Sequence, residues 1–256
     1  MAVLCRLLLG TCISSVLAFA AAHGAEEGER IGRGRYLVKI AGCNECHTEG
    51  YARNFGKVPE SEWMIGRAWG EAGPWGTTFP INVRLLLSGL TEDLWIDRVR
   101  HTATRPPMPW YNLRTMTDQD LRAMYAFIRF LGPAGKPAPE YLPPGESTEH
   151  PHVLFPADAP WPAKTGRTDS QWVSESADPL VHRGRYLAQV AWCNSCHTEG
   201  YALQAGDVPE DAFLKMIGCK AVHSVATVLG APPIRQTYGY TCKTSLRNSG
   251  SRKHAQ

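Results

Sequence analysis

The feature that most constrains this 256-residue chain is an internal repeat. Residues 33–60 align without gaps onto residues 183–210, and nineteen of the twenty-eight aligned positions are identical. The shared positions include Arg-Gly-Arg-Tyr-Leu, a C-x-x-C-H unit and Thr-Glu-Gly-Tyr-Ala. A match of this length indicates a duplicated domain. The chain should therefore contain two copies of one small fold, which its length and its 43% apolar content can support.

The first copy has the pattern of an all-α fold. Residues 34–41 carry an apolar stripe that leads into the first C-x-x-C-H unit and predict a helix. Residues 91–102 predict a second helix, capped by Thr91 with acidic residues in its first turn. Residues 117–132 predict a third, capped by Thr117 and ended by a Gly-Pro pair. The stripe of the first helix consists of Tyr36, Leu37, Ile40 and Ala41, and that of the third consists of Leu121, Met124, Tyr125 and Ile128.

The two copies are expected to be joined by a linker. Residues 133–178 are rich in proline and show no hydrophobic periodicity, which is typical of an extended connection. The predicted organisation is a first domain over residues 30–132, this linker, and the N-terminal part of a second domain over residues 179–216.

The last segment, residues 217–256, has no counterpart in the first copy. We tested whether it is out-of-frame translation by joining the third base of each codon to the first two bases of the next. From residue 217 the shifted frame can read Trp-Leu-Gln-Gly-Ser-Ala-Phe-Gly-Gly-Tyr-Gly-Pro-Trp, which resembles Trp63–Trp75. Because only the first base of each shifted codon is free, the match favours a second domain that is truncated or frame-shifted after about residues 213–217. A divergent natural tail is the alternative.

The N-terminus has the pattern of an export signal. Arg6 precedes an apolar run over residues 7–22, which ends in small residues, and this predicts a signal peptide over residues 1–25. The expected location is the periplasm. An uncleaved signal would instead anchor the chain to the membrane.

Each copy carries a C-x-x-C-H unit, which is the attachment pattern of c-type haem. Two cysteines three positions apart lie on one side of a helical turn, so both thiols can bond to one haem, and the adjoining histidine becomes an iron ligand. The predicted cofactor is haem c at two sites, with thioethers from Cys43, Cys46, Cys193 and Cys196 and iron ligands His47 and His197.

Two other uses of paired cysteines fit the sequence less well. A zinc site needs four ligands, whereas the two units are about 150 residues apart in separate copies. A thioredoxin-like site needs a βαβ pattern and no adjoining histidine.

The sixth ligand of the first iron is predicted to be Met108. It lies in Arg105–Trp110, where prolines on both sides fix the backbone around a flexible thioether. A Met-His pair closes the iron and raises its potential. The alternatives are Met64, Met116, Met124 and, for bis-His ligation, His101. The second copy offers no equivalent methionine, because Met216 lies only nineteen residues after its histidine.

On both C-x-x-C-H units and the Met-Pro-Trp element, the chain resembles the di-haem c-type cytochromes of Gram-negative bacteria, which consist of two class I cytochrome c domains. The resemblance covers about residues 30–132 and 180–213. It implies small helical domains that enclose the haem, and a close contact between the first and last helices at Gly34 and Tyr125. Trp69 and Trp75 are expected to be packing residues.

The predicted function is periplasmic electron transfer, without an enzymatic activity of its own. The resemblance implies redox partner proteins such as a dehydrogenase, a quinol oxidase system or a terminal oxidase. The mature chain is expected to be soluble or peripheral to the inner membrane. A net charge of +3 without a dense basic block excludes nucleic acid as an expected partner. The alternatives are a haem enzyme, either a di-haem peroxidase or a thiosulfate-oxidising cytochrome, and the haem subunit of a dehydrogenase complex.

Overall fold

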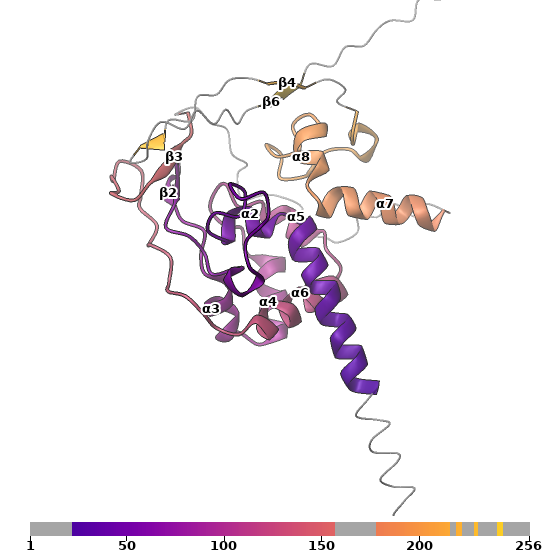
Figure 1. Cartoon of the computed structure of the whole chain (residues 1–256). Coiled ribbons are helices and arrows are strands. Elements are labelled where there is room, and N and C mark those ends of the chain that lie inside the picture. Colours follow the sequence, from indigo (N-terminus) through magenta and orange to yellow (C-terminus); the bar gives the residue numbers. More distant parts are fainter. Residues whose placement is uncertain (1–21, 157–177, 216–218, 222–227, 230–239, 243–256) are drawn as a thin grey trace, which may run out of the picture. The chain divides into compact units, whose positions relative to one another are not determined.

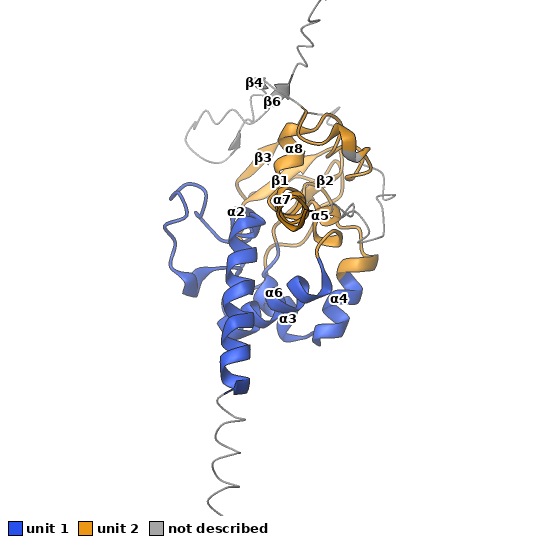
Figure 2. Cartoon of the chain, turned by 90° about the vertical axis from the view of Figure 1, so that its right-hand side faces the viewer, with its two compact units in different colours: residues 1–66, 81–98, 117–137 blue, residues 67–80, 99–116, 138–256 orange. Residues whose placement is uncertain are grey.

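The computed structural model describes residues 22–156 and 178–215, together with three short strands within residues 219–242. Most of the predicted signal peptide and most of the predicted out-of-frame tail lie outside the described residues. Contacts divide the chain into two compact units, drawn in blue and orange in Figure 2. Unit 1 comprises residues 1–66, 81–98 and 117–137, and unit 2 comprises residues 67–80, 99–116 and 138–256. The predicted first domain contributes segments to both units, and its boundaries stay predictions.

A long helix leads into the first C-x-x-C-H unit. It covers residues 22–40 and is the long indigo helix of Figure 1, so it extends beyond the predicted residues 34–41. Residues 22–29 of this extension are exposed, and its alanine, glutamate and arginine residues favour helix while its three glycines oppose it. The face that it buries differs from the predicted stripe, because Tyr36 is 41% exposed. The buried residues follow helical spacing and are Gly34, Leu37, Val38 and Ala41.

The predicted third helix is confirmed as α6, Asp118–Leu131. The Thr117 side chain accepts a hydrogen bond from the Asp120 backbone N–H at 3.1 Å, which is the expected N-cap. The chain leaves the helix at Gly132 with φ of 68°. The buried face consists of Leu121, Met124, Phe127 and Ile128.

Helix 22–40 and α6 approach each other closely at Gly34. A Cβ atom at Gly34 would lie 1.9 Å from the Ala123 carbonyl oxygen and 2.7 Å from the Phe127 Cβ. The predicted contact partner, Tyr125, has a different role, because its hydroxyl donates a hydrogen bond to the Leu90 carbonyl at 2.8 Å. The glycine therefore contacts the α6 backbone, not an aromatic ring.

Two further helices belong wholly or mostly to unit 1. The predicted helix over residues 91–102 is confirmed as α4, Glu92–His101, with the Thr91 hydroxyl accepting from the Leu94 N–H at 3.3 Å. α3, Val83–Ser88, was not predicted, and its N-cap Asn82 accepts from the Leu85 N–H at 3.0 Å. Among the described residues, none of the helices combines the length and the apolar character that a membrane span requires.

Unit 2 contains a small sheet, which the all-α prediction missed. β1, Gly70–Gly73, and β2, Gly76–Thr78, form an antiparallel hairpin, and β3, His152–Leu154, pairs in parallel with β1. β5, Val228–Leu229, pairs with β3 to give the order β2-β1-β3-β5. The hairpin is short and rich in glycine, so it lacks the alternating apolar pattern by which strands are recognised. The described chain is thus mostly helical with a small sheet.

The first part of the predicted linker packs on this hairpin. The Tyr141 hydroxyl donates a hydrogen bond to the Trp75 carbonyl at 2.8 Å, and the Trp75 ring lies 5.2 Å from that of Phe155. These contacts and β3 show that residues 138–156 are held by the sheet, so the expectation of a fully extended connection is wrong there. Residues 157–177 lie outside the described residues.

The remaining helices of unit 2 are α5 and the two helices of the second copy, α7 and α8. α5, Trp110–Arg114, follows the predicted Met108 element, and α7, Pro179–Val190, leads into α8, Cys193–His197 (orange in Figure 1). α7 begins at the N-cap Asp178 with a proline in its first turn. β4, Cys219–Ala221, and β6, Tyr240–Cys242, form a separate antiparallel pair.

Candidate functional site

The first C-x-x-C-H unit forms one short helix, α2, Cys43–His47. The chain enters it through Gly42 in the left-handed region, with φ of 63°, so the helix starts abruptly after helix 22–40. Cys43 and Cys46 are both free thiols, spaced by one helical turn. Burial, together with the neighbouring Cys46, raises the pKa of the Cys43 thiol to about 12. The Cys43 thiol is therefore protonated at physiological pH.

The His47 ring is oriented by a backbone carbonyl that the sequence did not identify. Its Nδ1 atom lies 2.8 Å from the Ile81 carbonyl oxygen. Since a carbonyl only accepts, Nδ1 must carry the proton, and the lone pair is left on Nε2. A histidine that donates one ring N–H to a carbonyl is the usual arrangement for metal ligation through the other nitrogen. The His47 ring thus has the tautomer that an iron ligand requires.

A buried pair holds α2 against the loop that follows it. The Thr48 hydroxyl donates to Asn44 Oδ1 at 2.7 Å and accepts from the Met64 N–H at 2.9 Å. Asn44 and Thr48 are each 1% exposed. The Met64 backbone has φ of 62°, a conformation that few non-glycine residues adopt. These hydrogen bonds hold Met64 against the end of α2, although the two bonded residues, Thr48 and Met64, are sixteen positions apart in the sequence.

The second C-x-x-C-H unit repeats these hydrogen bonds. The Thr198 hydroxyl donates to Asn194 Oδ1 at 2.8 Å and accepts from the Leu214 N–H at 2.9 Å. Leu214 has φ of 55°, and Trp192 takes the left-handed N-cap position of α8 with φ of 64°. The structural repeat therefore continues to Leu214, beyond the end of the gapless sequence match at residue 210.

An aromatic pair supports the loop in each copy. Tyr51 and Trp63 are edge-to-face with ring centroids 5.8 Å apart, and Tyr201 and Phe213 are edge-to-face at 5.7 Å. Pairs of this geometry add about 0.5–1.5 kcal/mol beyond the burial of their area. The second copy thus has the local packing of the first up to the point where its described residues end.

The two histidines differ in their described surroundings. His197 and Cys196 are exposed, whereas His47 and Cys46 are half-buried. The counterpart of Ile81 would fall after residue 217, and most of that segment lies outside the described residues. The carbonyl that orients His47 therefore has no described equivalent for His197.

Met108 lies in a loop of unit 2 that is anchored on both sides. Its N–H donates to the Arg105 carbonyl at 3.2 Å, and its carbonyl accepts from the Trp110 N–H at 2.9 Å. The Arg105 guanidinium stacks on the Tyr141 ring at 3.8 Å. The Met108 side chain is half-buried. Because His47 lies in unit 1, the pairing of Met108 with His47 stays a prediction.

Of the alternative ligands, the three methionines are buried and the histidine is exposed. Met64, Met116 and Met124 are 3%, 0% and 2% exposed and are part of the packed interior. The structural counterpart of Met64 is Leu214, whose side chain cannot bind iron. His101 is exposed at the last position of α4.

The residues of the first unit fit a covalently held haem. Two cysteines that form no disulfide lie on one short helix beside an imidazole whose Nδ1 faces a backbone carbonyl. The Asn44 Nδ2 atom is buried without a hydrogen-bond partner among the described residues, so an acceptor on a bound group would satisfy it. Within the part of the chain that the structure describes, no three or more His, Cys, Asp or Glu residues are grouped so that they could hold a metal ion.

Cytochrome subunits of dehydrogenases are among the known proteins that this chain resembles. It is 26% identical over 204 residues to the cytochrome c subunit of alcohol dehydrogenase (quinone) from Gluconobacter oxydans (strain 621H). It is 26% identical over 210 residues to the gluconate 2-dehydrogenase cytochrome c subunit of Pantoea cypripedii, and 24% identical over 181 residues to the fructose dehydrogenase cytochrome subunit of Gluconobacter japonicus. No protein-family model matches the chain.

These matches cover 73%, 75% and 66% of this chain but only 39%, 42% and 34% of the three relatives. The chain therefore spans about two fifths of the length of the relatives it matches. On its paired C-x-x-C-H units, on the geometry of α2 and α8, and on these relatives, it is similar to the cytochrome c subunits of bacterial dehydrogenases.

Proposed function

We propose that this protein carries electrons through covalently bound haem c, as the cytochrome subunit that receives them from a dehydrogenase. The observation that carries the proposal is the first C-x-x-C-H unit, in which His47 Nδ1 lies 2.8 Å from the Ile81 carbonyl oxygen on a helix whose two cysteines form no disulfide. This contact puts the ring proton on Nδ1, which is the tautomer in which an imidazole ligates a metal through Nε2. When bound, the haem iron supplies a one-electron couple between ferric and ferrous states. The relatives, which are named as cytochrome subunits of alcohol, gluconate and fructose dehydrogenases, support this role.

The residues of the chain have separate tasks in this function. Cys43 and Cys46 would hold the haem on α2, and Cys193 and Cys196 would hold one on α8. The buried hydrogen bond between Asn44 and Thr48 keeps α2 in one geometry. Met108 is the proposed second ligand of the first iron and would leave it no open position for substrate. The chain itself is then a carrier, and its partner dehydrogenase oxidises the substrate.

The proposed location is the periplasm. Attachment of haem to C-x-x-C-H units follows export, and residues 1–25 have the pattern of an export signal. A dehydrogenase on the same side of the membrane is the proposed electron donor, and a quinol oxidase system or a terminal oxidase is the proposed acceptor.

The experiment uses paired substitutions in the exported full chain. The variants are Cys43→Ser with Cys46→Ser, and Cys193→Ser with Cys196→Ser, each beside the unchanged protein. Haem staining of denatured protein and the alkaline pyridine spectrum count the covalent haem. We expect each pair to remove one of two haems and to leave the other reducible. Retention of all haem in either variant would contradict covalent attachment at that motif, and a spectrum that reductants do not change would contradict electron transfer.

A further inference from the structure

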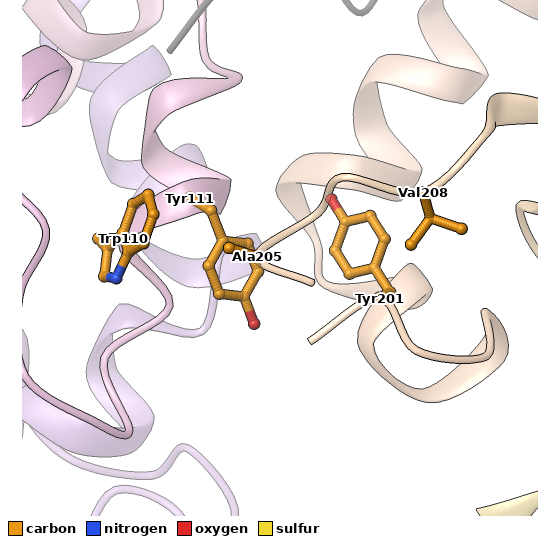
Figure 3. Packing of buried hydrophobic residues seen from close by; sticks show 5 residues of the cluster. All are labelled: Trp110, Tyr111, Tyr201, Ala205 and Val208. Carbon is orange, nitrogen blue, oxygen red and sulfur yellow. The ribbon is translucent and has the colours of Figure 1, made fainter. Parts of the chain in front are cut away.

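The loop that follows the second C-x-x-C-H unit is covered by helix α5 of the first copy. Figure 3 shows side chains from the two segments meeting in one buried cluster, all of whose members belong to unit 2. The Tyr111 ring is edge-to-face with Tyr201 at a centroid separation of 6.0 Å. Each member of the cluster is no more than 5% exposed. The cluster consists of Trp110, Tyr111, Tyr201, Ala205 and Val208.

The small side chain of Ala205 leaves room for this contact. Ala205 is 3% exposed and lies in the tip of the loop. The adjoining Gly206 faces the Tyr111 ring, since a Cβ atom at this glycine would lie 3.6 Å from Tyr111 Cδ2. A phenyl ring at position 205 would therefore need space that α5 fills.

The corresponding loop of the first copy has the same backbone conformation. The Phe55 N–H donates to the Ala52 carbonyl at 3.1 Å, and the Gly56 N–H donates to the Tyr51 carbonyl at 2.9 Å. The equivalent hydrogen bonds of the second copy measure 3.4 Å and 2.8 Å. The backbone φ is 53° at Phe55 and 49° at Ala205. The two loops thus hold their tips in one geometry and differ in the side chains that they carry there.

The tip of the first loop carries a large apolar side chain that the chain leaves exposed. Phe55 is 90% exposed, whereas the alanine at the equivalent position is buried. Its ring thus adds little to the stability of the fold, and its positive φ is one that few non-glycine residues adopt. One exposed aromatic ring is ordinary on a protein surface. This ring is informative because the equivalent position of the second copy belongs to a buried interface.

Two basic side chains flank the exposed ring. Arg53 and Lys57 are both exposed. The second copy has Leu203 and Asp207 at these two positions. Arg53 is paired with Glu49 at 2.7 Å, so the net charge of the tip comes from Lys57. A positive charge beside an apolar group favours a partner surface that bears carboxylates.

We propose that the tip formed by Arg53, Phe55 and Lys57 is the docking surface for the dehydrogenase that donates electrons to the first haem. The dehydrogenase receives Phe55 in an apolar pocket rimmed by Asp and Glu side chains. This inference rests on the proposed function, which supplies the donor. Aromatic anchors that enter a pocket carry much of the binding energy of an interface. The loop directly follows α2, so a partner bound to it lies beside the first attachment site. The second copy offers no such surface, because α5 covers its tip.

The test measures reduction of the exported full chain by its donor. The donor is supplied as the combined periplasm and membranes of a source strain that lacks this chain, with ethanol, gluconate or fructose added one at a time. Haem absorbance is followed at several protein concentrations, and dithionite serves as a reductant that needs no docking. Phe55→Ala is compared with Phe130→Ala, because Phe130 is a 60% exposed phenylalanine of the same unit. Lys57→Gln is compared with Lys39→Gln, which removes an exposed charge from helix 22–40.

We expect Phe55→Ala to raise the half-saturating concentration about 10- to 100-fold, which corresponds to the burial of one phenyl ring. Lys57→Gln should weaken the fall of the reduction rate with added salt. The two control variants should match the unchanged protein, and dithionite should reduce all of these proteins equally fast. Equal half-saturating concentrations for Phe55→Ala and Phe130→Ala would overturn the docking surface, while reducible haem would leave the proposed function standing. An unchanged protein that dithionite reduces, but that no substrate reduces, would overturn the dehydrogenase as the occupant.

Photo-cross-linking tests the same surface without relying on haem. Phe55 or Phe130 is replaced by benzoylphenylalanine in the full chain, and the cross-linked peptide of the partner is sequenced by mass spectrometry. We expect a product from the first position alone, joined to a dehydrogenase segment that combines apolar residues with Asp or Glu. No product, a product from both positions, a segment without carboxylates or a second copy of this chain would each overturn the proposal. A chain without covalent haem that gives the expected product would sink the proposed function and leave the docking surface standing.

Discussion

The Nδ1 atom of His47 lies 2.8 Å from the carbonyl oxygen of Ile81, which places one hydrogen-bond acceptor behind the first predicted iron ligand. The acceptor is backbone, so the Ile81 side chain, which is 45% exposed, takes no part. The neighbouring residue Asn82 fixes the turn, because its side chain caps α3 and donates to the Ala134 carbonyl at 2.7 Å.

Asn82→Ala should therefore loosen the Ile81 carbonyl, whereas Ile81→Ala should not. We expect Asn82→Ala to cost about 1–3 kcal/mol of unfolding free energy, because it removes a cap and leaves buried groups without partners. It should also shift the midpoint potential of the first haem, since the His47 hydrogen bond tunes the iron. Denaturant unfolding and a redox titration measure both effects. Equal potentials in Asn82→Ala and Ile81→Ala would show that the carbonyl does not tune the site.

Gly34→Ala and Gly184→Ala form a matched pair supplied by the repeat. A methyl group at Gly34 would meet the Ala123 carbonyl at 1.9 Å, whereas at Gly184 nothing described lies within 4 Å. We expect Gly34→Ala to lower the free energy of unfolding by about 1–3 kcal/mol through overpacking. Gly184→Ala should be neutral or stabilise α7 by up to about 1 kcal/mol, because alanine is the better helix former. Thermal unfolding of the two variants decides this, and equal losses would mean that α7 has a tight partner as well.

Met108→Ala should leave the sixth coordination position of the first iron without a protein ligand. The variant removes the predicted thioether ligand, so the Met-to-iron charge-transfer band of the oxidised protein should disappear and exogenous ligands such as cyanide should bind. The control is Met64→Leu, which introduces the residue found at the equivalent position 214 and should cost less than about 1.5 kcal/mol. Loss of the band in Met64→Leu with its survival in Met108→Ala would move the ligand to Met64.

The packing of the buried cluster that contains Tyr111 and Tyr201 should become less stable at high pH. Burial raises the pKa of Tyr111 from 10.0 to about 12. The folded protein thus holds the phenol proton more tightly than the unfolded chain, so this stabilisation is complete below pH 10 and is lost as the pH rises toward 12. For a buried tyrosine, two pKa units amount to roughly 2–3 kcal/mol. Between pH 9 and pH 12 the free energy of unfolding should fall less steeply for Tyr111→Phe than for the unchanged protein. Identical slopes would mean that the ionisation of Tyr111 does not contribute to the loss of stability.

The helices that carry their own end signals could be predicted from the sequence. Thr117 and Gly132 mark the ends of α6, and Thr91 marks the start of α4, because caps act through bonds within one turn. The repeat also predicted correctly that both C-x-x-C-H units would share one conformation. These features depend on residues that are close together in the chain.

The features that were missed depend on contacts between distant residues or on backbone atoms. The carbonyl behind His47 belongs to Ile81, thirty-four residues away, and any residue type could supply it. The contact between Tyr111 and Tyr201 joins residues from different copies, and the repeat, which contains Tyr201, does not indicate a partner outside its own copy. The parallel pairing of β3 with β1 likewise joins the predicted linker to a glycine-rich hairpin that has no alternating pattern.

The measurement that tests the account most directly is the intact mass of the exported, denatured chain. Covalent haem at both motifs predicts a mass that exceeds the polypeptide by two haem groups, with all four cysteines of α2 and α8 closed to alkylation. A colourless protein with the bare polypeptide mass and four alkylated cysteines in these motifs would contradict it.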